Sequence, residues 1–180
     1  MTGHCPARLT SQKTLHDMED PRHREFEALL HSHQGIVLKV ANTYCWHRED
    51  RADLVQEIAA QLWRAWPRYD PSRTFTTWMY RVALNVAISF VRKTVRHREI
   101  SVPLDETLHD AVAAPGIGAT QDRVQRLQAF IERQAPLDRA LLLLYLEDKG
   151  QRQIAEILGI TQTNVSTKIN RLKQKIRSEI

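Results

Sequence analysis

The sequence predicts an all-α protein made of two small helical domains joined by a flexible linker, and three observations carry that prediction. Apolar residues recur at steps of three and four along most of the chain, which is the period of a helix with one buried face. No segment shows the alternation of apolar and polar residues that is typical of a strand. The helical period is lost near the middle of the 180 residues, where proline and glycine gather, and this break separates the two expected domains.

The first expected domain covers residues 21–98 and follows an N-terminal extension, residues 1–20, which lacks a helical period and is expected to be flexible. A long helix begins at Pro21, and Gly35 in its interior weakens it by about 1 kcal/mol relative to alanine. Its apolar face is expected to consist of Phe26, Leu29, Leu30, His33, Ile36, Val37, Val40 and Tyr44.

Two more helices complete this domain as a bundle. One begins near Asp50 and ends before Pro67, because proline lacks the N–H that a helix interior needs. The other covers about residues 74–96 after a short loop. The second helix is expected to bury Leu54, Ile58, Leu62 and Trp66, and the third Met79, Val82, Ala83, Val86 and Phe90.

The second expected domain covers residues 122–180, after a linker over residues 99–121. Its apolar period starts at Val124, Leu127 and Ile131. Pro136 then opens a helix with four consecutive leucines, residues 141–144, which should form the centre of a second core. Gly150 is expected to end that helix as a left-handed cap.

Residues 151–169 carry the sharpest local pattern, that of a helix-turn-helix. Ala155 is small enough for a close helix contact, Gly159 can adopt a positive φ at the turn, and Thr161 can cap the second helix. The second helix would fit the major groove of DNA. The core positions are Ile154, Ile157, Leu158, Ile160, Val165, Ile169 and Leu172, and the outward positions are Gln162, Asn164, Ser166, Thr167, Lys168, Asn170, Arg171, Lys173 and Lys175.

Composition allows a nucleic-acid partner without requiring one. The hydrophobic fraction of 42% supports real cores, and the net charge of +5 is compatible with a polyanion. Two cysteines, Cys5 and Cys45, are too few for a disulfide framework and are expected to be free thiols in a reducing cytoplasm. No run reaches the roughly 18 apolar residues of a membrane span, and the N-terminus lacks a signal-peptide core. We therefore expect a cytoplasmic protein without direct membrane insertion.

No pattern of enzymatic chemistry is found. The sequence contains no glycine-rich phosphate loop, H-E-x-x-H motif or paired C-x-x-C, and we expect no catalytic residues, no cofactor and no enzymatic activity. His47 lies close to Cys45, but two ligands are too few for a structural zinc site, and we expect no bound metal.

Two segments of the first domain resemble a known family. Residues 53–64, DLVQEIAAQLWR, are similar to region 2.2 of the sigma-70 family, with its D-x-x-Q-E pattern. Residues 75–87, FTTWMYRVALNVA, are similar to the F-x-x-W-L-x-R-I-A-x-N signature of regions 2.3 and 2.4, although Leu84 and Ser89 depart from the residue types that members often carry. Pro136–Arg139 and the helix-turn-helix resemble region 4. The absence of a region 3 domain favours the small extracytoplasmic-function (ECF) group.

The resemblance implies an alternative sigma factor, which binds RNA polymerase core, recognises −35 and −10 promoter elements and promotes DNA melting. The clamp helices of the largest polymerase subunit would meet Asp53, Gln56, Glu57 and Gln61. The −10 element would meet Arg81, Asn85, Ser89 and Arg92, which belong with Thr77 and Arg96 to one polar stripe, and Tyr69 would help trap an unpaired base. The −35 element would meet Asn164, Ser166, Thr167, Lys168 and Arg171. An anti-sigma factor is a further partner that the resemblance implies.

Two other functions remain compatible with the residues, and a third is disfavoured by them. A free-standing helix-turn-helix repressor would bind duplex DNA as a dimer without polymerase. A helical protein that holds another transcription factor would need no base-reading positions. A subunit of a nucleic-acid enzyme would need a carboxylate or metal cluster, which the sequence does not offer.

Overall fold

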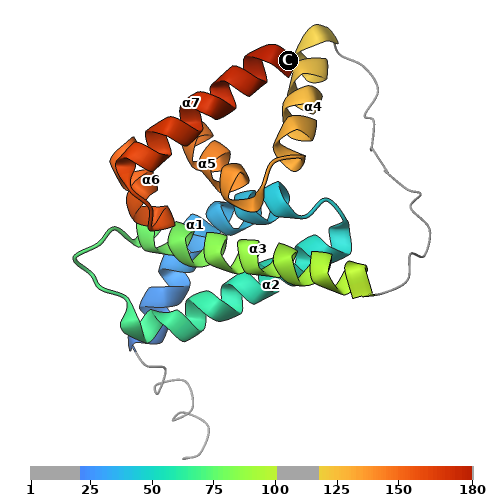
Figure 1. Ribbon diagram of the computed structural model, residues 1–180. Coiled ribbons are helices and arrows are strands. Elements are labelled where there is room, and N and C mark those ends of the chain that lie inside the picture. Colours follow the sequence, from blue (N-terminus) through green and yellow to red (C-terminus); the bar gives the residue numbers. More distant parts are fainter. Residues whose placement is uncertain (1–20, 101–117, 180) are drawn as a thin grey trace, which may run out of the picture.

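The computed structural model describes residues 21–100 and 118–179, and these residues contain helices and no strand, which confirms the all-α prediction (Figure 1). The expected extension, Cys5 and most of the expected linker lie outside the described residues. The helices are α1 (Pro21–Tyr44), α2 (Arg48–Ala65), the short 3₁₀-helix η1 (Trp66–Arg68), α3 (Phe75–Ile100), α4 (Gly118–Glu132), α5 (Pro136–Leu146), α6 (Gln151–Leu158) and α7 (Gln162–Glu179).

Helices α1, α2 and α3 form a three-helix bundle, in which every pair packs together. The expected stripe of α2 is buried completely at Leu54, Ile58 and Leu62. Trp66 was expected to continue that stripe, but it lies in η1 and is only partly buried, because α2 already ends at Ala65. Pro67 therefore ends the helix, as predicted.

Helix α1 is continuous through Gly35, where the added methyl group of an alanine would meet no atom within 4 Å. It buries Phe26, Val37, Val40 and Tyr44 from its expected face. Cys45 follows the helix as a buried free thiol, and burial raises the pKa of that thiol to about 11.

The buried face of α3 is wider than the sequence predicted. Met79 and Ala83 are buried as expected, whereas Val82, Val86 and Phe90 are only partly buried. One prediction was wrong, because Thr77 is buried instead of facing outward. Leu84, for which the sequence predicted no side of the helix, is also buried, with 1% of its surface exposed. The reason is that α3 is covered by α5 and α6 in addition to α1 and α2.

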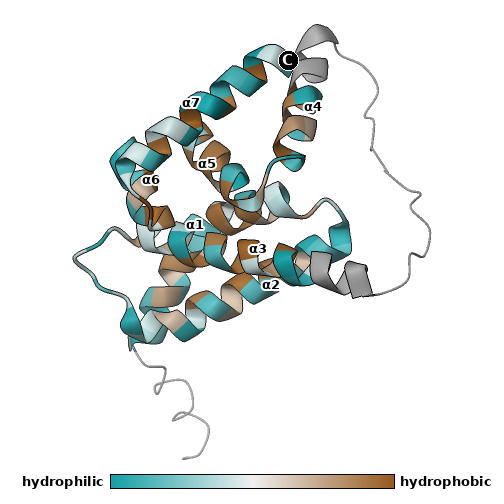
Figure 2. Ribbon diagram, in the orientation of Figure 1, coloured by the Kyte–Doolittle hydropathy of each residue, from teal (hydrophilic) through white to brown (hydrophobic). Residues whose placement is uncertain are grey.

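The second domain surrounds α5, whose four leucines, residues 141–144, are all buried, and whose ribbon is hydrophobic along much of its length (Figure 2). Pro136 occupies the first turn of this helix, as predicted. Phe130 of α4 is fully buried and adds an aromatic ring to the core. The helix-turn-helix helices α6 and α7 pack on each other and α7 packs on α5.

The turn after α5 differs from the prediction. The helix ends at Leu146, and the left-handed residue is Asp148, with φ 54°, instead of Gly150. The amide N–H of Lys149 donates to the Leu144 carbonyl (3.0 Å), so the turn closes before Gly150 is reached. Gly150 has an extended conformation and precedes α6 as its N-cap. Aspartate tolerates the left-handed region better than most residues, which permits this earlier turn.

The two domains are in contact with each other. Helix α1 packs on α5, and α3 packs on both α5 and α6. In Figure 1, α5 and α6 lie directly over the crossing of α1 and α3. Among the described helices, none combines the length and the apolar character needed to cross a bilayer.

Candidate nucleic-acid interface

The turn that aims α7 is built from three residues, as the sequence predicted. Gly159 has φ 66°, and the N–H of Ile160 donates back to the Ala155 carbonyl at 3.2 Å. The Thr161 hydroxyl oxygen accepts from the backbone N–H of Asn164 at 3.2 Å, which satisfies a donor at the start of the helix. Val165, Ile169 and Leu172 are buried, which fixes the opposite face of α7 toward solvent.

The predicted −35 residues are not equally available on that outer face. Asn164, Thr167 and Arg171 are exposed, whereas Ser166 is partly buried. The Lys168 ammonium donates to the Asp138 carboxylate of α5 at 3.0 Å, so its charge is already paired within the domain. Three of the five residues therefore point freely outward.

Lys173, one of the expected outward positions of the second helix, lies over the Tyr145 ring at 4.4 Å from the ring centre. A cation held over an aromatic face in this way contributes about 0.5–1 kcal/mol at an exposed site. The contact therefore stabilises the packing of α7 on α5.

The predicted −10 residues form a stripe along α3. Arg81, Asn85, Ser89 and Arg92 are all exposed and follow one another at steps of four, four and three. At 1.5 Å per residue the stripe is about 16 Å long. It carries two guanidinium groups and two neutral groups that can donate and accept, a combination that can hold phosphates and reach bases. The side chain of Arg96 lies outside the described residues.

Tyr69 belongs to a cluster of aromatic rings at the start of α3. Its ring stacks on Trp66 at 5.1 Å with an interplanar angle of 15°, and it contacts Phe75 and Trp78 at 5.8 and 5.2 Å. The Tyr69 hydroxyl donates to the Arg73 carbonyl at 2.8 Å. Tyr69 is therefore held in place before any ligand arrives.

The loop that follows Tyr69 is ordered by its own polar groups. The backbone N–H of Ser72 donates to the Asp70 carboxylate at 3.0 Å. Hydrogen bonds from Ser72 lower the pKa of Asp70. A loop ordered in this way can present its neighbouring rings to a base without a large loss of entropy on binding.

A second aromatic pocket was not predicted from the sequence. A cavity of about 280 Å³ opens at the end of α2, beside Arg22 and Arg64. His23 and Phe26 of α1 pack on Trp63 at 4.1 and 5.2 Å. No spacing rule could have found this pocket, because its walls come from residues about 40 positions apart in the chain.

The predicted polymerase-binding residues share one outward face of α2. Asp53, Gln56 and Glu57 are exposed, and Gln61 is partly buried. The Gln61 amide donates to a Glu57 carboxylate oxygen at 2.9 Å. This bond orients the carboxylate outward along the helix.

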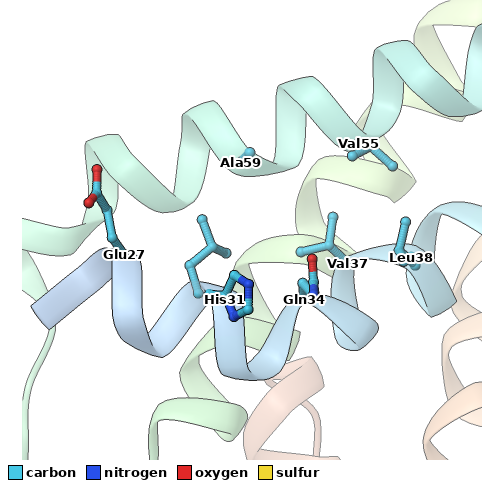
Figure 3. A pocket seen from close by; sticks show the side chains of 8 residues that line it. Glu27, His31, Gln34, Val37, Leu38, Val55 and Ala59 are labelled. Carbon is cyan, nitrogen blue, oxygen red and sulfur yellow. The ribbon is translucent and has the colours of Figure 1, made fainter. Parts of the chain in front are cut away.

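An apolar groove lies next to that face, between α1 and α2 (Figure 3). Its volume is about 330 Å³, and Leu38 at its edge is 49% exposed. Val55 and Ala59 of α2 line one wall and are neighbours of Gln56 in the helix. The lining residues are Glu27, Leu30, His31, Gln34, Val37, Leu38, Val55 and Ala59. The groove and the polar face therefore make one continuous surface that a partner helix could use.

Among the described residues, no group of three or more histidine, cysteine or acidic side chains could hold a metal ion. Cys45 and His47 therefore do not belong to a larger cluster of ligands in this part of the chain.

Comparison with known families gives two matches in chain order. Residues 29–97 match the model of sigma-70 region 2, and residues 125–176 match the model of sigma-70 region 4. A helical bundle followed by a helix-turn-helix is typical of two-domain helical proteins that bind DNA. The two matches identify one family within that class. The chain belongs to the sigma-70 family.

Relatives with similar sequences are named as ECF sigma factors. The ECF RNA polymerase sigma factor SigE of Mycolicibacterium smegmatis is 28% identical over 158 residues, which cover 84% of this chain and 60% of that protein. The ECF sigma-E factor of Haemophilus influenzae is 25% identical over 182 residues, which cover 96% of each chain. The chain thus spans only about three fifths of the mycobacterial relative.

Solved structures support the fold. The sigma factor RpoE of Bartonella quintana, in complex with the anti-sigma factor NepR, has a TM-score of 0.67 at 16% identity, covering 86% of this chain and 96% of that one. The structure of CnrH in complex with the cytosolic domain of CnrY has a TM-score of 0.61 at 20% identity, covering 86% of each chain.

Proposed function

We propose that this protein is an alternative ECF sigma factor, which binds RNA polymerase core, recognises −35 and −10 promoter elements and promotes DNA melting. One observation carries the proposal: a single chain presents two separate outward polar faces, on α3 and on α7, in segments that match regions 2 and 4 of one family. A free-standing repressor would need only the second face.

The face of α7 is proposed to read the −35 element. Arg171, Asn164 and Thr167 are exposed and can reach base edges and phosphates in the major groove. Ser166 and Lys168 complete the proposed set, with Lys168 released from Asp138 when DNA offers a phosphate.

The stripe on α3, with Arg81, Asn85, Ser89 and Arg92, is proposed to bind the −10 element. Tyr69 and its aromatic neighbours would stack on a base that has left the duplex, which offsets the few kcal/mol that extrusion costs. Melting by this route uses binding energy alone, and we propose that the chain has no catalytic activity of its own.

The face of α2 with Asp53, Gln56, Glu57 and Gln61 is proposed to meet the clamp helices of the largest polymerase subunit. The adjacent groove would accept an apolar side chain from the same partner. Because its partner is the polymerase, the protein is proposed to act in the cytoplasm. An anti-sigma factor, as in the Bartonella complex, is a further proposed partner.

The proposed domain boundaries are residues 21–98 for region 2, 99–121 for the linker and 122–180 for region 4, after an extension over residues 1–20. The helical structure of α3 continues to Ile100, and α4 already begins at Gly118. The linker between helices is therefore proposed to be shorter than the sequence pattern alone suggested.

The decisive experiment is a titration of the purified chain against RNA polymerase core, followed by size-exclusion chromatography. We expect one-to-one co-elution, and Glu57→Ala should weaken it because the variant removes an outward carboxylate from the proposed interface. Glu179→Ala is the matched control, since Glu179 is an exposed carboxylate on α7, outside the proposed interface. Absence of co-elution at micromolar concentration, with tight duplex binding by the chain alone, would instead establish the repressor function.

The groove is tested by a second pair of variants in the same titration. Leu38→Asp places a charge at the edge of the groove and should weaken core binding. Val124→Asp is the control, because Val124 is a similarly exposed apolar residue on α4, with an exposed fraction of 50%. Equal affinities for both variants would exclude the groove from the interface.

A further inference from the structure

The cavity at the end of α2 has an aromatic wall that the core of the bundle does not require. Leu62, the last residue of the buried stripe of α2, is fully buried, whereas the next residue, Trp63, is 39% exposed. Trp63 and Trp66 line the cavity together with His23, from the start of α1. A tryptophan with this much exposed surface stabilises the core less than a buried one would, and its indole face is available to a ligand that enters the cavity.

The rings of this wall are held in place before any ligand binds. Phe26, which is 3% exposed, contacts Trp63 and Trp66 at 5.2 and 5.4 Å between ring centres. The Trp66 indole N–H donates to the Arg22 carbonyl at 3.0 Å, which ties η1 to the first turn of α1. His23 packs on Trp63 at 4.1 Å. Because these side chains have already lost much of their freedom, a ligand that stacks on them orders little more of the protein.

The cavity is basic as well as aromatic. Arg22 and Arg64 belong to its lining, and none of the six described residues that line it is acidic. Arg64 is exposed on α2. Guanidinium groups bind phosphate oxygens and also stack on flat rings. An aromatic wall beside two guanidinium groups therefore matches a nucleotide, which combines a flat base with a phosphate.

The cavity lies next to Tyr69, the residue proposed to stack on an unpaired base. Trp66 belongs to both places, because it lines the cavity and also stacks on Tyr69 at 5.1 Å with an interplanar angle of 15°. The start of α1, the end of α2 and the beginning of the loop before α3 lie at one end of the bundle (Figure 1). A DNA strand that passes Tyr69 can therefore reach the cavity with a neighbouring nucleotide.

The size and chemistry of the cavity favour an unpaired base over duplex DNA. Its volume of about 280 Å³ suits a single flat group and is far too small for a base pair held in a duplex. Duplex DNA offers phosphates and base edges, and the face of a base becomes accessible only when the base has left the stack. An acidic peptide could pair with the arginines, but it would leave the face of Trp63 unused.

We propose that this cavity is a second binding site for an unpaired DNA nucleotide, in which the base stacks on Trp63 and Arg64 binds the phosphate. The proposal deepens the proposed sigma function and rests on it for its consequence, because a base of the melted strand would find a second place beside Tyr69. The melted strand is then stabilised by more than one stacking contact.

The first test measures binding of a short fluorescein-labelled oligodeoxythymidine to the full-length chain, by fluorescence anisotropy at low salt. Trp63→Leu removes the aromatic face but keeps an apolar side chain, and it should weaken binding roughly five- to hundredfold, as loss of one base–aromatic stack does. Trp46→Leu is the matched control, because Trp46 is a similarly exposed tryptophan (44%) that precedes the other end of α2. It should leave the affinity unchanged. Far-UV circular dichroism verifies that each variant is folded.

The phosphate contact is tested in the same assay at several salt concentrations. Arg64→Gln should weaken binding and make the salt dependence shallower by roughly 0.7, the value for one phosphate contact to a single strand. Arg48→Gln, at an exposed position at the start of the same helix, should change neither quantity. A loss in Arg64→Gln with no loss in Trp63→Leu would mean that the site binds an anionic group without a base, such as an acidic peptide, and would overturn the proposal. Failure of the unsubstituted chain to bind the strand would overturn it as well.

A competition arm separates a DNA strand from a free nucleotide. Thymidine monophosphate should displace the strand only at a far higher nucleotide concentration, because it lacks the neighbouring nucleotides that would bind along Tyr69 and α3. Displacement at an equal nucleotide concentration would make a free nucleotide the ligand and would contradict the proposal.

The core titration distinguishes failure of this site from failure of the proposed function. Trp63→Leu and Trp46→Leu should bind core equally, and holoenzyme with Trp63→Leu should bind a promoter that carries a mismatched, open segment less tightly than holoenzyme with Trp46→Leu. Strand binding that depends on Trp63 in a chain that never binds core would keep the site and exclude the sigma function. Promoter-dependent transcription with equal strand binding by the two variants would keep the function and exclude the site.

Discussion

The two helices proposed to contact DNA, α3 and α7, reach the surface by different means. Helix α3 has 26 residues, and its polar stripe depends only on steps of three and four along one long helix. Helix α7 is aimed by a turn in which Gly159 has a positive φ and Thr161 caps the next helix. A single substitution should therefore leave the stripe on α3 in place, whereas a substitution in the turn before α7 should change the direction of that helix.

The cores of the two domains differ as well. The first domain gathers aromatic rings around Trp66 and Tyr69 at one end of the bundle, while the second relies on the aliphatic run 141–144 of α5. All four tryptophans of the chain lie in the first domain. Tryptophan fluorescence thus reports on the unfolding of the first domain alone, whereas circular dichroism reports on both domains. The stabilities of the two domains can therefore be measured separately.

The largest expected effect is that of a core deletion in the second domain. Leu144→Ala leaves a cavity at a fully buried position and should cost about 2–5 kcal/mol in the free energy of unfolding of that domain. In urea denaturation, the midpoint by circular dichroism should fall more than the midpoint by fluorescence. Leu62→Ala, at an equally buried position of α2, should lower the fluorescence midpoint instead. Identical shifts by both probes would mean that the contacts between the domains make them unfold as one unit.

The two helices proposed to contact DNA should respond separately to the loss of an arginine. Arg171→Ala should reduce promoter-dependent transcription by an amount equivalent to about 1–3 kcal/mol, because a guanidinium that is proposed to read bases is lost from α7. On a promoter with an altered −35 element, the same variant should cause little further loss. Arg81→Ala should behave in the opposite way and remain sensitive to the −35 sequence. Transcription assays with reconstituted holoenzyme and both promoters measure this difference, and equal sensitivity of the two variants would contradict the assignment of the faces.

Replacement of glycine by alanine should change the free energy of unfolding in opposite directions at two positions. Gly159→Ala forces a Cβ into the left-handed region and should destabilise the second domain by about 1–2 kcal/mol. Gly35→Ala lies within α1 with open space around it and should stabilise the first domain by about 0.5–1 kcal/mol. Urea denaturation, followed by circular dichroism for Gly159→Ala and by fluorescence for Gly35→Ala, provides the test. Destabilisation by Gly35→Ala would mean that α1 is bent or interrupted there in solution.

The smallest expected effect concerns the paired lysine of α7. Asp138→Asn releases Lys168 and should cost at most about 1 kcal/mol in stability, since the pair is partly exposed. Because Lys168 no longer has to leave a carboxylate, holoenzyme with Asp138→Asn should bind promoter DNA more tightly by a similar amount. Lys168→Ala, which removes the proposed phosphate contact, should make the salt dependence of that binding shallower by roughly one. Fluorescence-anisotropy titrations at several salt concentrations measure the slope. An unchanged slope would remove Lys168 from the proposed DNA-binding set.

Much of the fold could be predicted from the sequence, because the features concerned are local. The stripe Leu54, Ile58 and Leu62, the stop at Pro67 and the cap at Thr161 all depend on residues within four positions of one another. The family followed from two such local patterns in the right order, and the matches over residues 29–97 and 125–176 confirmed it. The individual DNA and polymerase contacts remain predictions.

The failures have a common cause. Thr77 was misplaced because a helix covered on two sides has no single buried face, and nothing in the spacing of its residues reveals the second covering layer. Gly150 was misplaced because Asp148 adopted the left-handed conformation first. The pairing of Lys168 with Asp138 was missed because 30 residues separate them in the chain.

The sequence by itself determined which segments are helical, where most of them end and which sides of α2 and α7 face outward, since each of these depends on neighbours three or four residues away. Only the tertiary structure decided which residues lie at the contact between the two domains. Glu147 is 108 residues from Lys39 and 67 from Tyr80, and their meeting depends on how two folded domains pack. A helical period constrains the faces of single helices, and it carries no information on how far apart two faces lie once the chain is folded.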